Sequence, residues 1–196
     1  MSNLPYRIAT LVYIFDGQGR LLLLRRSGTP NFNLYSPIGG KLEQASGESP
    51  YACALREVRE EAGVQLELAD LRLCGIVSER AFEGRGHWLI FCFESLRTVE
   101  LSERNIREGR LEWVAPDAVA AKPIPNTDRE IIWPLVRRHS AMLNNGSTHR
   151  REIFSVHIDC SRPGDDSLRI TLESGETERT GTWNHQGRGH EVRTPT

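Results

Sequence analysis

Three glutamates, Glu57, Glu60 and Glu61, form the pattern in this sequence that is best suited to chemistry. Their spacing of i, i+3 and i+4 places all three carboxylates on one face of a helix. Like charges this close destabilise a helix unless a cation lies among them, and Mg²⁺ and Mn²⁺ prefer such oxygen ligands. Such a metal, beside Gly39 and Gly40, would neutralise a polyphosphate and lower the pKa of a bound water. The pattern therefore favours phosphoryl chemistry.

A plainer interpretation of the same glutamates is a solvated helix face. Arg56 and Arg59 lie among them and would satisfy their charges at the surface. Helices rich in glutamate and arginine are common, so the spacing alone does not separate the two interpretations. The surrounding sequence has to decide between them.

The helix that would carry the glutamates is well marked at both ends. Ser49 and Pro50 predict its start, because serine caps the first turn and proline is tolerated at the first helical position. Gly63 is typical of a residue that ends a helix, so we expect the helix to cover residues 50–62. Its apolar stripe, at helical spacing, consists of Ala52, Leu55, Val58 and Ala62.

The remaining elements predict a mixed α/β sandwich. Residues 16–19 have turn chemistry, so residues 21–24 are expected to return as a strand beside residues 7–15. Further strands are predicted over residues 71–77, 88–93 and 111–114, and a second helix over residues 128–143. Strands that alternate with helices in this order indicate helices packed on a sheet.

The stretch from Gly40 to Val64 resembles the Nudix hydrolase family, whose box reads G-x5-E-x7-R-E-U-x-E-E-x-G-U with U aliphatic. From Glu48 onward the match is complete, ending in Arg56-Glu57-Val58-Arg59-Glu60-Glu61-Ala62-Gly63-Val64. Between Gly40 and Glu48 the sequence has seven residues where the family has five. We expect the two extra residues among Gln44, Ala45 and Ser46, in a surface loop that tolerates insertion.

The resemblance implies a Nudix-type α/β/α sandwich with a mixed sheet, and hydrolysis of a nucleoside diphosphate linked to another moiety. It implies Mg²⁺, with Mn²⁺ as an alternative, held by Glu57, Glu60, Glu61 and the Gly40 carbonyl. The same glutamates are the catalytic candidates. Glu108 lies where several relatives place a further metal-binding carboxylate; an ordinary loop glutamate is the alternative. Arg56 is expected to position Glu48 or the loop by a salt bridge.

The wider chain looks most like the MutT-like branch of the family, the 8-oxo-dGTP diphosphatases. The implied substrate is a modified nucleoside triphosphate, cleaved to a monophosphate and pyrophosphate. Sugar nucleotides, dinucleoside polyphosphates, RNA ends and non-catalytic nucleotide sensing remain alternatives. Asp128 either reads the base or caps the second helix, and the cap is slightly favoured. The expected substrate-binding residues are Arg26, Tyr35, Ser36, Gly39, Gly40, Lys41 and Asp128.

Aromatic and basic residues outside the box have plain interpretations. Phe82, Trp88 and Trp113 could line a base pocket, but aromatic residues on strands more often belong to a core. A basic run could attract polyphosphates or RNA ends, although a solvated helix end is favoured because Asn144-Asn145-Gly146 interrupts the charges. The run consists of Arg137, Arg138, His139, His149, Arg150 and Arg151.

The chain divides into a predicted Nudix domain over residues 5–143, an extension over residues 144–173 and a tail over residues 174–196. The extension could form a β-hairpin from residues 153–159 and 168–172. The tail is expected to be disordered, because Trp183 and Val192 are too few apolar residues to offset the entropy of ordering it.

Charge and composition set limits on the partners. A formal net charge of -1 among 196 residues argues against a generally basic nucleic-acid coat protein. The four cysteines are scattered with no C-x-x-C pair, and no apolar stretch approaches the ~18 residues that span a bilayer. We therefore expect a cytoplasmic monomer or homodimer that binds a small nucleotide, without a membrane or a stable nucleic-acid partner.

Overall fold

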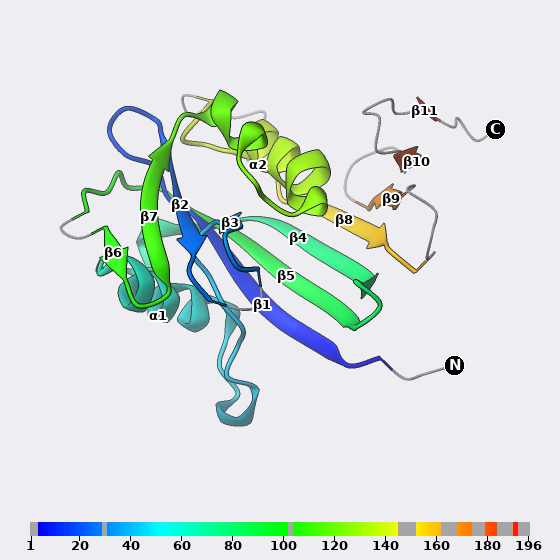
Figure 1. Cartoon of the computed structure of the whole chain (residues 1–196), viewed down its shortest axis with the longest axis horizontal. Coiled ribbons are helices and arrows are strands. Elements are labelled where there is room, and N and C mark those ends of the chain that lie inside the picture. The colour runs from blue at the N-terminus through cyan, green and yellow to red at the C-terminus, as the bar shows by residue number, and fades with distance from the viewer. Residues whose placement is uncertain are drawn as a thin grey trace.

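The computed structural model describes residues 4–28, 31–101, 104–144, 152–161, 168–173, 179–183 and 190–191. Within these residues the strands form two sheets (Figure 1). The larger sheet contains, in spatial order, β1 (Tyr6–Tyr13), β5 (Gly86–Ser95), β4 (Leu71–Phe82), β8 (Phe154–Asp159), β9 (Leu168–Leu172), β10 (Arg179–Trp183) and β11 (His190–Glu191). The smaller sheet contains β3 (Tyr35–Ser36), β2 (Leu21–Arg26), β7 (Gly109–Val114) and β6 (Asn105–Ile106). β1 pairs with β5 and β4 with β8 in parallel, while the other pairs are antiparallel, so the larger sheet is mixed.

Helices lie on both sides of the strands β1, β4 and β5, as Figure 1 shows. The helix α1 (Pro50–Ala62) has the bounds that the sequence predicts. A π-helical turn, η4 (Asp128–Ile132), leads into the short helix α2 (Trp133–His139). Three 3₁₀ turns complete the set in the described residues: η1 (Gln44–Ser46), η2 (Leu68–Asp70) and η3 (Pro116–Ala121). The observed architecture confirms the predicted α/β class.

Two hydrophobic cores hold the layers together, and β2 contributes to both. Leu21 and Leu23 belong to the core that includes α2, whereas Leu22 and Leu24 belong to the core that includes α1. All four leucines are almost completely buried, which explains why this strand is a continuous apolar run rather than an alternating one. Burial at this level stabilises the fold by roughly 1.5–3 kcal/mol for each leucine.

The predicted return of residues 21–24 beside residues 7–15 is wrong. β1 pairs with β5, and β2 pairs with β3 and β7 in the other sheet. The turn leaves one isolated bridge, Phe15 to Leu21, together with a hydrogen bond from the Leu22 N–H to the Ile14 carbonyl of 2.9 Å. The two strands separate because the leucine run needs cover on both faces, which a position at the edge of β1 would not give.

The second helix is shorter than predicted. It ends at His139, four residues before the expected Leu143. The Ser140 hydroxyl donates to Glu94 Oε2 at 2.8 Å, and the Ala141 N–H donates to Glu94 Oε1 at 2.9 Å. Glu94 is fully buried and also accepts from Arg72 Nε at 2.6 Å. The buried Glu94 thus takes the Ala141 N–H, which a continuing helix would bond to the residue 137 carbonyl.

The C-terminal extension joins the larger sheet. β8 and β9 form the predicted antiparallel hairpin, and β8 lies parallel to β4 with Phe154 opposite Gly75. The predicted disorder of the tail is wrong for residues 179–183 and 190–191, whose backbones form β10 and β11. β10 pairs antiparallel with β9, and β11 pairs antiparallel with β10. The rest of the predicted disordered tail lies outside the described residues.

No helix in the described part of the chain is long and apolar enough to cross a membrane.

Candidate active site

The start and the end of α1 set the direction of its glutamates. The Ser49 hydroxyl accepts a hydrogen bond from the Ala52 N–H at 3.2 Å, and Pro50 occupies the first turn. Gly63, at φ 65°, ends the helix and donates to the Arg59 carbonyl at 3.1 Å. The inner face buries Cys53, Ala54, Val58 and Ala62. Cys53 Sγ lies 3.8 Å from the Gly40 carbonyl oxygen, so the glycine loop lies against this side of the helix.

Two glycines let this loop approach the helix. The Gly39 N–H donates to Glu61 Oε2 at 3.1 Å, and the Gly40 carbonyl accepts from the Thr10 N–H at 2.8 Å. A Cβ on Gly40 would lie 2.1 Å from Glu57 Oε1, and one on Gly39 would lie 2.1 Å from the Thr10 carbonyl oxygen. Neither position has room for a side chain, so the loop backbone lies directly against the carboxylates of Glu57 and Glu61.

Arg56 holds the loop and the helix together. Its guanidinium donates to both carboxylate oxygens of Glu48, from Nε at 2.8 Å and from Nη2 at 3.0 Å. It also donates to Glu57 at 2.7 Å, to Glu60 at 3.2 Å and to the Lys41 carbonyl at 3.2 Å. The bidentate contact lowers the pKa of Glu48 to about 2. The predicted positioning role of Arg56 is confirmed.

The two extra residues of the loop do not disturb this arrangement. Residues 44–46 form the exposed turn η1, which ends at Gly47 in the left-handed conformation, φ 70°. The turn returns the chain so that the Glu43 N–H donates to Glu48 Oε2 at 2.8 Å. Gln44, Ala45 and Ser46, among which the sequence predicts the two extra residues, are therefore exposed to solvent. Glu48 still contacts Arg56.

Burial separates the three helical glutamates. The side chain of Glu60 is 52% exposed, whereas that of Glu57 is 13% exposed and Glu61 as a whole is 6% exposed. Burial, together with the charges of Glu57 and Glu108, raises the pKa of Glu61 to about 7. Burial likewise raises the pKa of Glu57. Carboxylates crowded in this way are electrostatically prepared for a cation.

The donor set fits a hard divalent cation. Glu57 and Glu61 present carboxylate oxygens against the backbone of Gly40 and Gly39, and Glu108 lies near enough for its charge to act on Glu61. In this arrangement no group of three or more acidic, histidine or cysteine side chains among the described residues is spaced to hold a metal. One reason is that Arg56 occupies Glu57 and Glu60, so a metal would compete with this guanidinium for their oxygens.

A cavity of about 440 Å³ opens in front of these carboxylates. Most of the predicted site residues line it: Arg26, Tyr35, Ser36, Gly39, Gly40, Lys41, Glu57, Glu61 and Asp128. Glu60 and Glu108 are not part of its lining. The structure thus brings the glycine loop, the inner glutamates and the predicted substrate-binding residues to one space.

Two of the predicted substrate-binding residues, Arg26 and Tyr35, differ in their hydrogen-bond partners. The Arg26 Nε is buried and has no hydrogen-bond partner within the described residues. The atom is shielded from solvent, so the part of Arg26 that lines the cavity consists of its other atoms. Tyr35 is 6% exposed, its hydroxyl donates to Glu112 Oε2 at 3.0 Å, and Lys122 Nζ lies 4.7 Å from its ring centroid. The Tyr35 ring is therefore a fixed wall of the cavity.

The favoured interpretation of Asp128 as a helix cap is wrong. The helical segment already begins at Asn126, and Asp128 is its third residue. No side-chain cap is made at the start of η4. Asp128 instead lines the cavity, and burial raises its pKa to about 7. The backbone of η4 turns this carboxyl inward, which a capping pattern in the sequence does not reveal.

Several residues that line the cavity are not among the site residues that the sequence predicts. Phe82 and Trp88 line the cavity, and Trp88 also packs against the core that includes α2, while Trp113 packs against the core that includes α1. Glu79 also lines the cavity and is 4% exposed. A glutamate at an inward position of a strand, two residues after the buried Val77, is the signal that could have found it.

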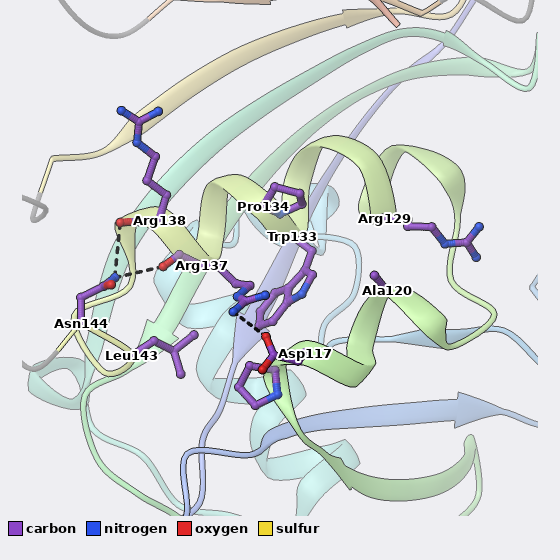
Figure 2. Close-up of a pocket in the computed structure, with 10 residues that line it drawn as sticks. Asp117, Ala120, Arg129, Trp133, Pro134, Arg137, Arg138, Leu143 and Asn144 are labelled. Carbon is purple, nitrogen blue, oxygen red and sulfur yellow. Dashed lines mark hydrogen bonds and ion pairs between the residues drawn. The ribbon is translucent and has the colours of Figure 1, made fainter. Parts of the chain in front are cut away.

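A larger hollow of about 690 Å³ lies beside η3, η4 and α2 and contains none of the predicted site residues (Figure 2). The exposed side chain of Arg137 donates to Asp117 Oδ1 at 2.8 Å there, and the carbonyls of Arg137 and Arg138 accept from Asn144. These contacts agree with a solvated helix end for the basic run. His149, Arg150 and Arg151 lie outside the described residues.

The fold and the cavity define an α/β protein whose acidic helix and glycine loop form one wall of a deep polar site. The family model described as NUDIX domain matches residues 5–133, and the chain belongs to this family. The model ends inside α2, so the strands from β8 onward lie beyond the matched region.

Known relatives agree with this assignment. A curated RNA pyrophosphohydrolase of Roseobacter denitrificans is 38% identical over 71 residues, which are 36% of this chain and 42% of that protein. One of Gluconobacter oxydans is 40% identical over 63 residues, 32% of this chain and 35% of that protein. The chain thus spans about two fifths of these relatives. A MutT protein structure from Bacillus halodurans has a TM-score of 0.60 at 24% identity and covers 86% of this chain and 95% of its own, which shows the fold.

Proposed function

We propose that the protein is a divalent-metal-dependent pyrophosphohydrolase that cleaves a nucleoside triphosphate to a monophosphate and pyrophosphate. The observation that carries the proposal is that Glu57 and Glu61 line the cavity with Gly40, whose backbone lies against Glu57. Arg26 and Lys41 line the same cavity, and their positive charges support a phosphate ligand there.

Each residue of that wall has a role in the proposal. Glu57, Glu60, Glu61 and the Gly40 carbonyl would hold the metal, with Glu108 as a further ligand. When bound, Mg²⁺ or Mn²⁺ supplies charge neutralisation of the polyphosphate and lowers the pKa of a water ligand. Arg26 and Lys41 bind phosphate oxygens, and the glutamates orient the attacking water. Arg56 keeps Glu48 and the loop in place, so its role is positioning.

The far part of the cavity suits a nucleobase. Aromatic and aliphatic side chains form its walls, and polar groups at its end come from β4 and η4. Tyr35 and Ser36 come just before the glycine loop in sequence and line the same cavity. Phosphate-binding candidates and base-binding candidates lining one cavity support the MutT-like proposal.

A second candidate substrate is the triphosphate end of an RNA chain. Two relatives of known name are RNA pyrophosphohydrolases, although each similarity covers less than half of either protein. Arg7 and Lys41 lie over the Trp88 ring, with the Arg7 Cζ 5.3 Å and the Lys41 Nζ 5.8 Å from its centroid. A ring flanked by cations at a cavity lining is suited to stack a second nucleotide.

The test is a substrate panel with purified protein and Mg²⁺. The panel contains canonical and oxidised nucleoside triphosphates, sugar nucleotides, dinucleoside polyphosphates and a short triphosphorylated RNA, with products separated by chromatography. We expect release of pyrophosphate that is abolished by a chelator and reduced at least about 100-fold in Glu61→Gln. Gly40→Ala should show a similar loss, because the new methyl group displaces Glu57.

Glu100→Gln is the matched control, since Glu100 is exposed and does not line the cavity. It should retain full activity. Folded protein that binds nucleotides but hydrolyses no substrate, with or without metal, would contradict the proposed activity and favour nucleotide sensing.

A further inference from the structure

Glu79 is a buried carboxyl on an otherwise apolar face of β4. The face also carries Val77 and Ala81, which are buried as well. A carboxyl removed from water is costly unless it has partners, and an aliphatic side chain would fill the same position without that cost. The position therefore calls for a ligand or a function.

The neighbours of Glu79 lie on η4 and just before it. The hydroxyl of Thr127, itself 5% exposed, hydrogen-bonds the Glu79 carboxyl, and the charge of Asp128 acts directly on it. Both Glu79 and Asp128 line the cavity. Within the described residues neither carboxyl forms an ion pair with a lysine or arginine. With no basic side chain paired to them, the two carboxyls are available to an occupant of the cavity that they line.

The surroundings of the two carboxyls suit a planar heterocycle. Phe82 and Trp88, on either side of the β4–β5 turn, line the cavity together with Ile90 and Ile132. Burial raises the pKa of Glu79 and of Asp128 to about 7, so near neutral pH the two groups together retain a proton. Such a pair offers hydrogen-bond acceptors and one donor side by side at the end of an apolar slot.

We propose that Glu79 is a specificity-determining residue that accepts a hydrogen bond from the exocyclic amino group of the substrate base, opposite Asp128. This inference rests on the proposed function, because it assigns the base end of the same cavity. It predicts that the protein prefers amino-bearing bases to the same ring systems without the amino group, since an unmet buried carboxyl rejects the analogue.

The test compares two substrate pairs that differ by one amino group: GTP with ITP, and ATP with purine riboside triphosphate. We expect at least one amino-bearing member to be favoured about tenfold or more in kcat/KM, since a site built for a donor discriminates against its loss. Glu79→Leu should reduce this preference to within about twofold, and Glu79→Gln, which retains an accepting oxygen, should keep most of it.

Glu83→Gln is the matched control, because Glu83 is an exposed glutamate on the adjacent turn. It should show wild-type preference. Thermal melting of each variant separates a loss of fold from a loss of discrimination. If Glu79→Leu melts at a lower temperature but keeps the wild-type preference, Glu79 is only structural and the inference is wrong.

Binding of GMP and IMP by calorimetry gives a readout that needs no hydrolysis. We expect GMP to bind more tightly than IMP in the wild type and equally in Glu79→Leu. If no triphosphate is cleaved but this difference is present, the proposed activity fails and the inference survives. If cleavage depends on Glu61 but neither the base preference nor nucleotide binding depends on Glu79, the proposed activity survives and the inference about Glu79 fails.

Discussion

At the scale of single residues, one guanidinium organises the acidic wall. Arg56 contacts Glu48, Glu57 and Glu60 and the Lys41 carbonyl, so it links the start of the loop to the middle of α1. The contact with Glu48 is bidentate and only 10% of that side chain is exposed. A pair this well aligned and this sheltered contributes more than an ordinary surface ion pair.

We predict that Glu48→Gln weakens the fold at neutral pH but not in strong acid. Because the folded-state pKa of Glu48 is lowered to about 2, its stabilisation is present above its usual pKa of 4.5 and is lost as the pH falls towards 2. The free energy of unfolding should drop by roughly 1–3 kcal/mol at pH 7, and wild type and variant should converge near pH 2.

Urea unfolding at several pH values measures this difference. Glu43→Gln serves as the control, because the carboxyl of Glu43 is exposed and its stability effect should stay small at every pH. A difference between wild type and Glu48→Gln that is constant from pH 7 to pH 2 would show that the ion pair is not its cause.

At the scale of elements, α1 is a rigid support because both of its ends are fixed. Ser49 satisfies a backbone donor in the first turn, and Gly63 ends the helix in the left-handed conformation. Between these ends Tyr51 packs edge-on against Phe93 of β5, with ring centroids 4.6 Å apart. A helix seated in this way presents Glu57 and Glu61 at fixed positions against the glycine loop.

We predict that Ser49→Ala lowers the free energy of unfolding by about 1 kcal/mol, because the Ala52 N–H loses its acceptor. Chemical denaturation of the two proteins measures the change. Ser46→Ala, in the exposed turn η1, is the matched serine control and should change stability by less than about 0.5 kcal/mol. Equal effects of the two substitutions would show that the cap does not set the stability of α1.

At the scale of the whole molecule, the C-terminal extension completes the core. β8 covers the edge of β4, and its inward side chains Phe154, Val156 and Ile158 are almost completely buried. The Phe154 ring lies so close to Gly75 that a Cβ there would be 2.1 Å from its Cζ. The sheet that carries Glu79 is thus stabilised by residues beyond the matched family region.

We predict that truncation after residue 144 lowers the melting temperature by at least about 10 °C or yields aggregated protein. The reason is the loss of three buried side chains, each worth roughly 1.5–3 kcal/mol, and the exposure of the β4 edge. Truncation after Glu173, which keeps β8 and β9, should lower it by less than about 4 °C. A stable, active protein ending at residue 144 would show that the extension is an appendage.

The sequence alone determined the features that are local or that belong to a long motif. The bounds of α1 followed from a cap, a proline and a glycine, which act within a few residues of themselves. The role of Arg56 and the place of the extra loop residues followed from the spacing of the family box. The hairpin of β8 and β9 followed from alternation around a turn.

Only the tertiary structure decided which strands pair and which side chains share the cavity. The leucines of β2 pair away from β1 because they fill two cores, and that requirement depends on elements far away in the sequence. Asp128 lies in the π-helical turn and lines the cavity instead of capping the helix. Glu79 lines the same cavity from a strand about fifty residues earlier in the sequence. Such contacts between distant segments depend on how the layers pack, so the local spacing of residues does not predict them.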